Sequence, residues 1–214
     1  MRAGGWSDGR TGGTAVLMAL LLTAHPPNRL AAQVSFHVAV GARYSSTVVH
    51  DSVVTAFDLR PALAPAFLVS ARDELRPGWS ADVTLDVAPS GMRRHERGGS
   101  FDAGSFTAVA FTVGLRRQFA PGVSARAGVG GLRYLADQTG VFREGTGGIF
   151  PTGTVAGTYA IPLPFAKQHQ LEIEARYDIH RFITPALRTE GFSSSRPVHR
   201  VAVLVRMGWG GTTP

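Results

Sequence analysis

The chain has 214 residues, enough for one domain of moderate size, and no cysteine, which excludes disulfides, a thiolate metal site and a lipid anchor on an N-terminal cysteine. Hydrophobic residues make up 44% of the chain, yet the mean hydropathy is only +0.05, so apolar and polar residues are interleaved. The formal net charge of +7 comes almost entirely from arginines that are spread along the chain. This dispersal argues against nucleic acid as a partner, because nucleic-acid binding requires a basic patch or helix.

The first 32 residues have the layout of a secretory signal peptide. Arg2 and Arg10 precede an apolar run from Ala15 to Leu22, and small residues that end at Ala32 follow it. A charged segment, a short apolar segment and a small-residue cleavage site, in this order, direct secretion. The apolar run is shorter than the about 20 residues of a membrane-spanning helix. We therefore expect export and cleavage after Ala32, which assigns residues 1–32 to the signal peptide.

Eight segments of the remaining chain have the pattern of β-strands. In chain order they span residues 34–45, 62–71, 79–88, 107–116, 123–135, 149–161, 170–182 and 200–209. Short connections, several marked by Pro and Gly, alternate with long ones, which span 46–61, 89–104, 136–148 and 183–197. If neighbouring strands are antiparallel, all long connections lie at one rim of the sheet and all short ones at the other.

The segment 170–182 has the clearest pattern. Its odd-numbered residues from 171 to 179 are apolar, and its even-numbered residues from 170 to 180 are polar or charged. A period of two residues is the pattern of a strand with two unlike faces. The length is close to the about 9–11 residues that a tilted strand needs to cross a bilayer. One face is therefore predicted to contact lipid, and the other to contact a polar interior.

Two segments depart from strict alternation. Leu68 interrupts the apolar and polar sequence of the second segment. In the fifth segment, Leu132 and Tyr134 change parity after the adjacent glycines Gly130 and Gly131, so these glycines predict a β-bulge. Neither departure changes the expected number of strands.

The segments predict an all-β fold, namely an eight-stranded antiparallel up-and-down transmembrane β-barrel over residues 33–209, followed by a short tail, 210–214. A sheet in lipid has to close, because every backbone amide and carbonyl needs a partner within the protein. Eight strands enclose an interior just wide enough for side chains to fill. We therefore expect a filled lumen rather than a conducting pore.

The two parities assign the candidate site residues. Those on the apolar parity of the last two strands are predicted to face lipid: Leu171, Ile173, Tyr177, Ile179, Val201, Val203 and Val205. Those on the polar parity are predicted to form a charge network in the lumen: Arg43, Asp82, Asp86, Arg116, Arg126, Glu172, Glu174, Arg176, Asp178, Arg200 and Arg206. Because an unpaired buried charge is costly, Glu174 is expected to lie within ion-pair distance of Arg206, Arg200 or Arg126. Aromatic residues near strand ends are expected at the membrane interfaces: Tyr44, Trp79, Phe119, Tyr159, Phe182 and Trp209.

The export signal, the eight alternating segments and the aromatic end of the last one resemble the small OmpA/OmpX/opacity-type outer-membrane β-barrels. The resemblance covers residues 33–209 and rests on pattern rather than on a motif. It implies a Gram-negative outer-membrane location, insertion by the barrel-assembly machinery, short periplasmic turns, four long extracellular loops, and a structural, adhesion or surface-interaction role without enzymatic activity. In that family an aromatic residue usually ends the chain, whereas here residues 210–214 follow Trp209.

Outer-membrane lipids are the expected partners of a barrel that is expected to be monomeric. Arg93, Arg94 and Arg97 lie in the second long connection, where their guanidinium groups suit the phosphates of lipopolysaccharide. The seven histidines show no metal-ligand spacing on a rigid element, so no metal site and no other cofactor are predicted.

Two alternative functions remain open. Arg176 and His180 are similar to the arginine and histidine of lipid A deacylases, which are also eight-stranded barrels. Those enzymes place a serine two residues after the histidine, where this chain has Phe182. A secreted barrel with an apolar ligand cavity, like a lipocalin, would turn its charged face to solvent. The direction of the charged face therefore separates the lipocalin hypothesis from the membrane barrel.

Overall fold

The computed structural model describes residues 34–51, 56–137, 140–162, 170–192 and 195–209. The predicted signal peptide with its cleavage site after Ala32, and the predicted tail 210–214, lie outside the described residues. Among the residues that are described, no helix is both long and apolar enough to cross a membrane.

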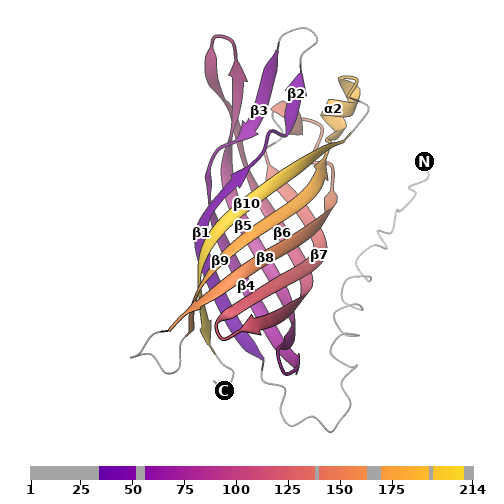
Figure 1. Ribbon diagram of the computed structural model, residues 1–214. Coiled ribbons are helices and arrows are strands. Elements are labelled where there is room, and N and C mark those ends of the chain that lie inside the picture. Colours follow the sequence, from indigo (N-terminus) through magenta and orange to yellow (C-terminus); the bar gives the residue numbers. More distant parts are fainter. Residues whose placement is uncertain (1–33, 52–55, 138–139, 163–169, 193–194, 210–214) are drawn as a thin grey trace, which may run out of the picture. The chain divides into compact units, whose positions relative to one another are not determined.

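Eight strands form a closed ring of tilted strands (Figure 1). They are β1 (Ser35–Ser45), β4 (Ala64–Arg76), β5 (Trp79–Glu96), β6 (Gly99–Ala120), β7 (Val123–Ala136), β8 (Ile149–Ile161), β9 (Gln170–Phe182) and β10 (Arg196–Trp209). Neighbours in the ring pair in antiparallel fashion, β5 with β6 among them. The first strand, β1, pairs with the last, β10, and this pairing closes the ring. The prediction of an all-β, eight-stranded antiparallel barrel is confirmed.

The seam between the first and last strands is continuous. Its register runs without a shift from Phe36 opposite Trp209 to Ser45 opposite Arg200. Closure pairs the backbone amides and carbonyls of both strands within the protein, as a sheet in lipid requires. Because side chains alternate with the same period on both strands, the unbroken register also keeps each face uniform across the seam.

The connection predicted as a loop over residues 89–104 is a β-hairpin. β5 continues to Glu96 and β6 begins at Gly99, so only Arg97 and Gly98 remain between the two strands. The prediction of four long loops is wrong at this position. A strand that projects beyond the membrane has no lipid-facing side, so apolar residues do not mark it in the sequence.

The first long connection also contains strands, β2 (Val49–Asp51) and β3 (Phe57–Pro61). β3 pairs with both β2 and the projecting end of β5, so a sheet in the order β2-β3-β5-β6 extends beyond the ring (Figure 1). The helices η1 (Gly140–Phe142) and α2 (Pro185–Thr189) belong to the two other connections at this rim. We call this rim the loop end and the opposite rim the turn end.

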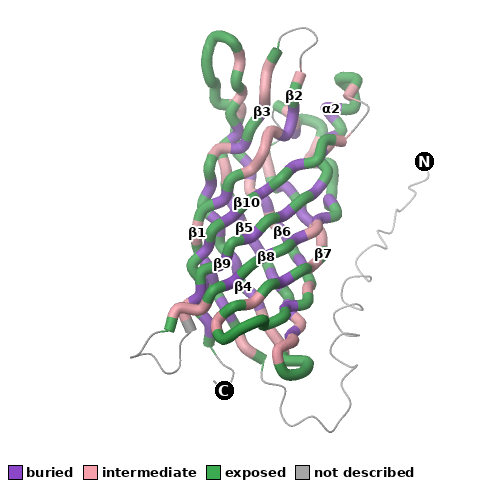
Figure 2. The backbone as a smooth tube through the Cα atoms, in the orientation of Figure 1, coloured by how far each residue is buried: buried purple, intermediate pink, exposed green. Residues whose placement is uncertain are grey.

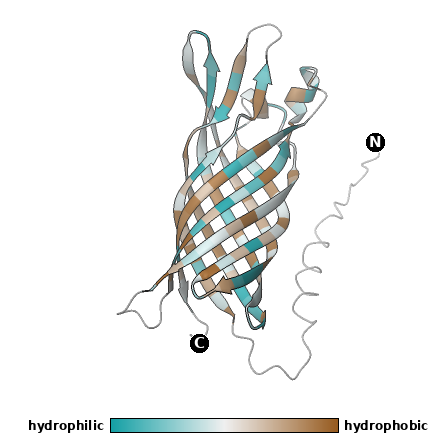
Figure 3. Ribbon diagram, in the orientation of Figure 1, coloured by the Kyte–Doolittle hydropathy of each residue, from teal (hydrophilic) through white to brown (hydrophobic). Residues whose placement is uncertain are grey.

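Buried and exposed residues alternate along the ring strands (Figure 2), and hydrophobic and hydrophilic residues alternate along the same strands (Figure 3). Leu68 follows this rule, because its side chain is buried between two outward-facing neighbours on β4. It belongs to an interior apolar patch on adjacent strands, together with Ala39, Ala66, Ala202 and Leu204. The second segment is therefore regular, and its leucine marks an apolar part of the lumen.

The bulge predicted at Gly130 and Gly131 is not formed, since β6 and β7 pair in one register through both glycines. Leu132 and Tyr134 keep the parity of the polar residues and are buried inside the barrel. The prediction failed because it assigned apolar side chains to the outer face, whereas the lumen near the loop end is lined by apolar residues.

Candidate functional site: the lumen and the loop end

The structure places all eleven residues of the predicted charge network inside the barrel. Each has a relative exposure of 3% or less. They come from β1, β5, β6, β7, β9 and β10 and form two layers. The turn-side layer consists of Asp82, Arg116, Arg126, Glu172, Glu174 and Arg206, and the loop-side layer consists of Arg43, Asp86, Arg176, Asp178 and Arg200.

The turn-side layer is organised around two carboxylates. Nε of Arg126 donates to Oδ1 of Asp82 at 2.5 Å, and Nη1 of Arg206 donates to Oε2 of Glu174 at 2.6 Å. Arg116 lies between them, with Nε 3.7 Å from Asp82 and Nη2 3.5 Å from Glu174. The layer therefore connects β5, β6, β7, β9 and β10 through charge-assisted hydrogen bonds and the longer ion pair between Arg116 and Asp82.

Neutral hydroxyl groups complete this layer, and the sequence pattern alone did not identify them as partners. Nη1 of Arg116 donates to Thr158 Oγ1 at 2.6 Å, Nη2 of Arg126 donates to Thr112 Oγ1 at 3.0 Å, and Arg206 donates to Ser70 Oγ. All three hydroxyl residues are on the inward parity of their strands. Their parity was the available signal, but a hydroxyl side chain fits either face of a strand.

Lumen-facing glycines make room for Arg126. A Cβ built on Gly114 would lie 3.0 Å from Cζ of this arginine, and a Cβ on Gly128 would lie 3.1 Å from its Nη1. Both positions also approach the backbone of the neighbouring strand too closely for a Cβ, at 2.7 Å from Ala127 O and 2.6 Å from Val113 O. The two glycines are therefore part of the site, although they carry no charge.

The loop-side layer is organised around Arg43 and Asp178. Nη1 and Nη2 of Arg43 donate to the two carboxylate oxygens of Asp86 at 2.7 and 2.5 Å, a bidentate pair. Nη2 of Arg43 also lies 3.5 Å from Oδ2 of Asp178, whose Oδ1 accepts from Nε of Arg176 at 2.8 Å. Arg200, on β10, is buried in the same layer and is the cross-strand neighbour of Asp178.

An apolar cap covers the loop-side layer. Its rings include Phe106, Tyr134, Phe142, Phe150 and Phe182, with centroid distances between 5.2 and 6.1 Å. The prediction of Phe182 at a membrane interface is wrong, because its side chain is 2% exposed and packs inside this cap. Its even residue number, which gives it the inward parity of β9, was the signal that could have placed it there.

His180 lies at the edge of the cap nearest the loop-side layer. Its Nε2 is 2.7 Å from the hydroxyl of Tyr134, and the ring is buried against Phe150. This histidine therefore faces the lumen rather than lipid. In the part of the chain that the structure describes, no three His, Cys, Asp or Glu residues are grouped to hold a metal ion.

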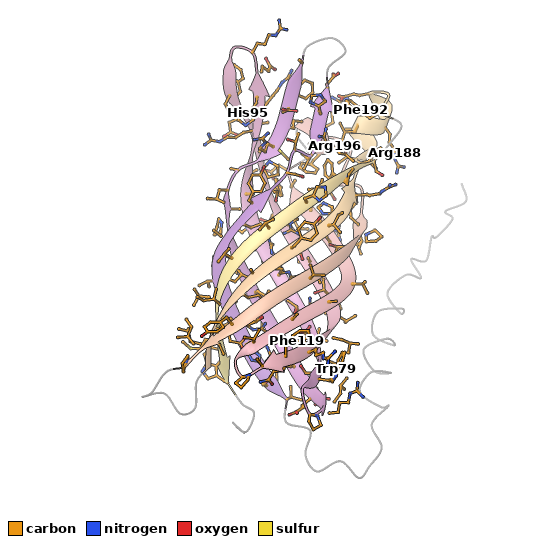
Figure 4. The ribbon with its side chains drawn as sticks, in the orientation of Figure 1. Trp79, His95, Phe119, Arg188, Phe192 and Arg196 are labelled. Carbon is orange, nitrogen blue, oxygen red and sulfur yellow. The ribbon has the colours of Figure 1, made fainter. Side chains whose placement is uncertain are left out.

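The outer wall carries the apolar parity. Of the seven residues predicted to face lipid, six are exposed by 36 to 57%, and Leu171 is half-buried on the same face. Trp79 and Phe119 lie near the turn end (Figure 4), where the guanidinium of Arg117 stacks on both rings at 5.4 and 5.3 Å. The apolar wall is thus bordered by an aromatic and basic rim at that end.

The three arginines predicted to meet lipopolysaccharide lie on the β5–β6 hairpin but differ in their surroundings. Arg93 and Arg97 are exposed. The guanidinium of Arg94 stacks on Phe57 of β3 at 4.2 Å and pairs with Glu96. Arg94 therefore holds the projecting sheet together, and only Arg93 and Arg97 present unshielded guanidinium groups.

Comparisons with known proteins agree with this geometry. Neither protein-family models nor curated proteins yield a match. Among solved structures, the crystal structure of Neisserial surface protein A superposes with a TM-score of 0.53 at 10% identity, over 82% of this chain and 96% of that one. The solid-state NMR structure of the outer-membrane protein AlkL in lipid bilayers superposes with a TM-score of 0.50 at 10% identity, over 88% and 96%. This chain has the fold of the small eight-stranded outer-membrane β-barrels.

Proposed function

We propose that this chain is a non-enzymatic surface-interaction protein of the outer membrane, exported by its signal peptide and inserted as a monomer by the barrel-assembly machinery. In this orientation the loop end is extracellular and the turn end is periplasmic. The observation that carries the proposal is the contrast between the two parts of the molecule. The lumen is filled by two charged layers and an apolar cap, while the loop end bears a structured sheet that projects beyond the ring.

We propose lipopolysaccharide phosphates as the ligand of the hairpin. Arg93 on β5 and Arg97 in the turn between β5 and β6 are both exposed. A guanidinium group binds a phosphate through two parallel hydrogen bonds. Pairing with β3 supports the hairpin, so its arginines are presented on a sheet rather than on a free loop. A rigid support reduces the ordering cost of binding.

The alternative of a lipid A deacylase lacks support from the site. His180 is buried in the lumen and bonded to Tyr134, whereas lipid hydrolysis requires a nucleophile and base on the lipid-facing wall. The lipocalin-like alternative predicted the charged face outside, and the charged face is inside.

Binding of the purified barrel to immobilised lipopolysaccharide tests the proposal. The variant Arg93→Ala/Arg97→Ala should bind about tenfold more weakly, which corresponds to about 1.4 kcal/mol. Its matched control is Arg188→Ala/Arg196→Ala, which removes two exposed arginines from another part of the loop end (Figure 4). The control should bind as the unchanged protein does. Equal weakening by both variants would show diffuse attraction and contradict a hairpin site.

Two further readings complete this experiment. Dephosphorylated lipopolysaccharide should bind weakly to the unchanged protein, because the proposed contacts are with phosphate. Mass spectra of the recovered lipid A should be unaltered. Loss of an acyl chain in the presence of the protein would contradict the non-enzymatic role and would restore the deacylase alternative.

A further inference from the structure

Arg200 differs from the other buried arginines of the lumen. Its side chain is 2% exposed, yet among the described residues neither Nη1 nor Nη2 has a hydrogen-bond acceptor, and no carboxylate pairs with it. Each of the other five has a carboxylate oxygen within 3.5 Å: Arg43, Arg116, Arg126, Arg176 and Arg206. A buried guanidinium without an acceptor strongly destabilises a folded protein.

The imbalance belongs to the whole loop-side layer and not to one side-chain position. Arg43, Arg176 and Arg200 carry three positive charges, and Asp86 and Asp178 carry two negative charges, so the layer has one surplus positive charge. If Arg200 turned toward Asp178, its cross-strand neighbour, it would compete with Arg43 and Arg176 for the same carboxylate. The turn-side layer has three buried arginines and three buried carboxylates. A fourth arginine, Arg72, lies 3.7 Å from Glu172, but its side chain is 17% exposed, so the additional positive charge of that layer reaches solvent.

Hydrogen-bond donors show the same surplus. Four buried guanidinium nitrogens of this layer have no acceptor among the described residues, namely Nε of Arg43, Nη2 of Arg176, and Nη1 and Nη2 of Arg200. The corresponding buried acceptors without a hydrogen bond are two oxygens, Oδ2 of Asp178 and Oγ1 of its cross-strand neighbour Thr154. The donors without a hydrogen bond therefore outnumber the acceptors without one.

The surroundings favour one anion bound inside the barrel over diffuse screening by ions of the bulk solvent. The apolar cap, which contains Tyr134, Phe182 and Val198, lies between this layer and the loop end. On the other side, Ala202 and Leu204 continue the inward face of β10 as part of the interior apolar patch. Arg200 is thus positioned between apolar groups, where electrostatic attraction to an anion is strong.

We propose that the loop-side layer binds one small monovalent anion, of the chloride class, at Nη1 and Nη2 of Arg200. One negative charge makes the layer neutral. A halide accepts hydrogen bonds from Nη1 and Nη2 of Arg200, and it leaves the hydrogen bonds of Asp86 and Asp178 in place. The anion is a structural ligand of the folded barrel.

Thermal unfolding of the purified barrel in detergent micelles tests this site. In sodium chloride or bromide the melting temperature should exceed that in sodium gluconate of equal ionic strength by about 2–4 °C, and the increase should saturate with halide concentration. Arg200→Met removes the surplus charge, so its melting temperature should not depend on the anion. Arg196 is an exposed arginine at the start of the same strand, so the melting temperature of Arg196→Met should depend on the anion as that of the unchanged protein does. Equal melting temperatures of the unchanged protein in chloride and gluconate would overturn the proposal.

Crystals of the unchanged protein grown in sodium bromide provide a second measurement that needs no variant. An anomalous bromide peak within contact distance of Nη1 and Nη2 of Arg200 is the expected result. Electron density for water at Arg200, without an anomalous signal, would show that the guanidinium is solvated, and would overturn the anion site.

Discussion

Nη1 of Arg206 donates to Oε2 of Glu174 at 2.6 Å, and this ion pair joins β10 to its neighbour β9 inside the barrel. Nη2 of Arg116, from β6, lies 3.5 Å from the same oxygen. Glu174 is therefore shared by an arginine of an adjacent strand and an arginine from across the lumen. Of the three arginines considered for Glu174 from the sequence, Arg206 is the one that pairs with it.

Replacement of Glu174 by Gln should therefore destabilise the barrel by about 3–5 kcal/mol, because two buried guanidinium groups lose their shared carboxylate. Equilibrium unfolding by urea in lipid vesicles measures this free energy. Glu190→Gln is the matched control, since its ion pair with Arg143 is on the surface, at 2.8 Å, and should contribute at most about 1 kcal/mol. Similar losses for both variants would show that the lumen is hydrated and its charges are screened.

Val203 tests the lipid-facing wall. It lies in the middle of β10 with 57% of its side chain exposed, so Val203→Arg should cost about 2–4 kcal/mol near the bilayer midplane. Ile149→Arg is the control, because Ile149 is the first residue of β8 at the loop end and is 70% exposed. Near the interface the cost should fall to about 0–1 kcal/mol. Folding titrations in vesicles that give the same stability for both arginine variants would contradict the depth assigned to Val203.

Gly128 tests the packing around Arg126. A Cβ at this position would lie 2.6 Å from Val113 O and 3.1 Å from Nη1 of Arg126, so Gly128→Ala should be destabilising by about 1–3 kcal/mol, as overpacked interiors generally are. Gly157→Ala, on β8, is the control, because its Cβ would meet nothing within 4 Å. Urea unfolding should rank Gly157→Ala near the unchanged protein. The reverse ranking would show that Arg126 takes another path through the lumen.

Tyr134 tests the apolar cap. Its hydroxyl and Nε2 of His180 form a buried pair at 2.7 Å, so Tyr134→Phe should cost about 1–3 kcal/mol by leaving the imidazole nitrogen without a partner. Tyr177→Phe removes a hydrogen bond of similar length, 2.6 Å to Nδ1 of His199, from the outer face. The outer pair should contribute less, because its groups are exposed, whereas the Tyr134–His180 pair is buried. Heat-induced unfolding in detergent compares the two, and a larger loss for Tyr177→Phe would contradict a sealed cap.

The sequence predicted the fold through the period of its side chains, and it did so best where lipid marks one face. β9 and β10 alternate so regularly that their lipid-facing and inward residues, such as Val203 and Glu174, were assigned one by one. Closure and strand number then followed from the needs of the backbone in lipid. The pattern was misleading at three apolar residues of the interior. Leu68, Leu132 and Phe182 were misassigned for this single reason, because parity and hydropathy give opposite answers for an apolar side chain inside a barrel.

The remaining features depend on contacts that no local pattern contains. The hairpin of β5 and β6 continues into the projecting sheet because β3 pairs with Arg93 and Arg94, far away in sequence. The ion pairs of the lumen depend on which strands lie across from each other, as Arg116 and Glu174 do. The predicted network already contains six arginines and five carboxylates, but the position of the surplus charge at Arg200 becomes visible only when the buried residues are separated into two layers.

A filled barrel interior is the basis of the proposal that the protein acts at its loop end and not as a conduit. Single-channel recording from the purified mature chain in planar lipid bilayers tests this claim most directly. Two charged layers and an apolar cap predict no steady conductance above the baseline of the membrane across a wide voltage range. A large, stable single-channel conductance would show that the lumen is open and would contradict the account.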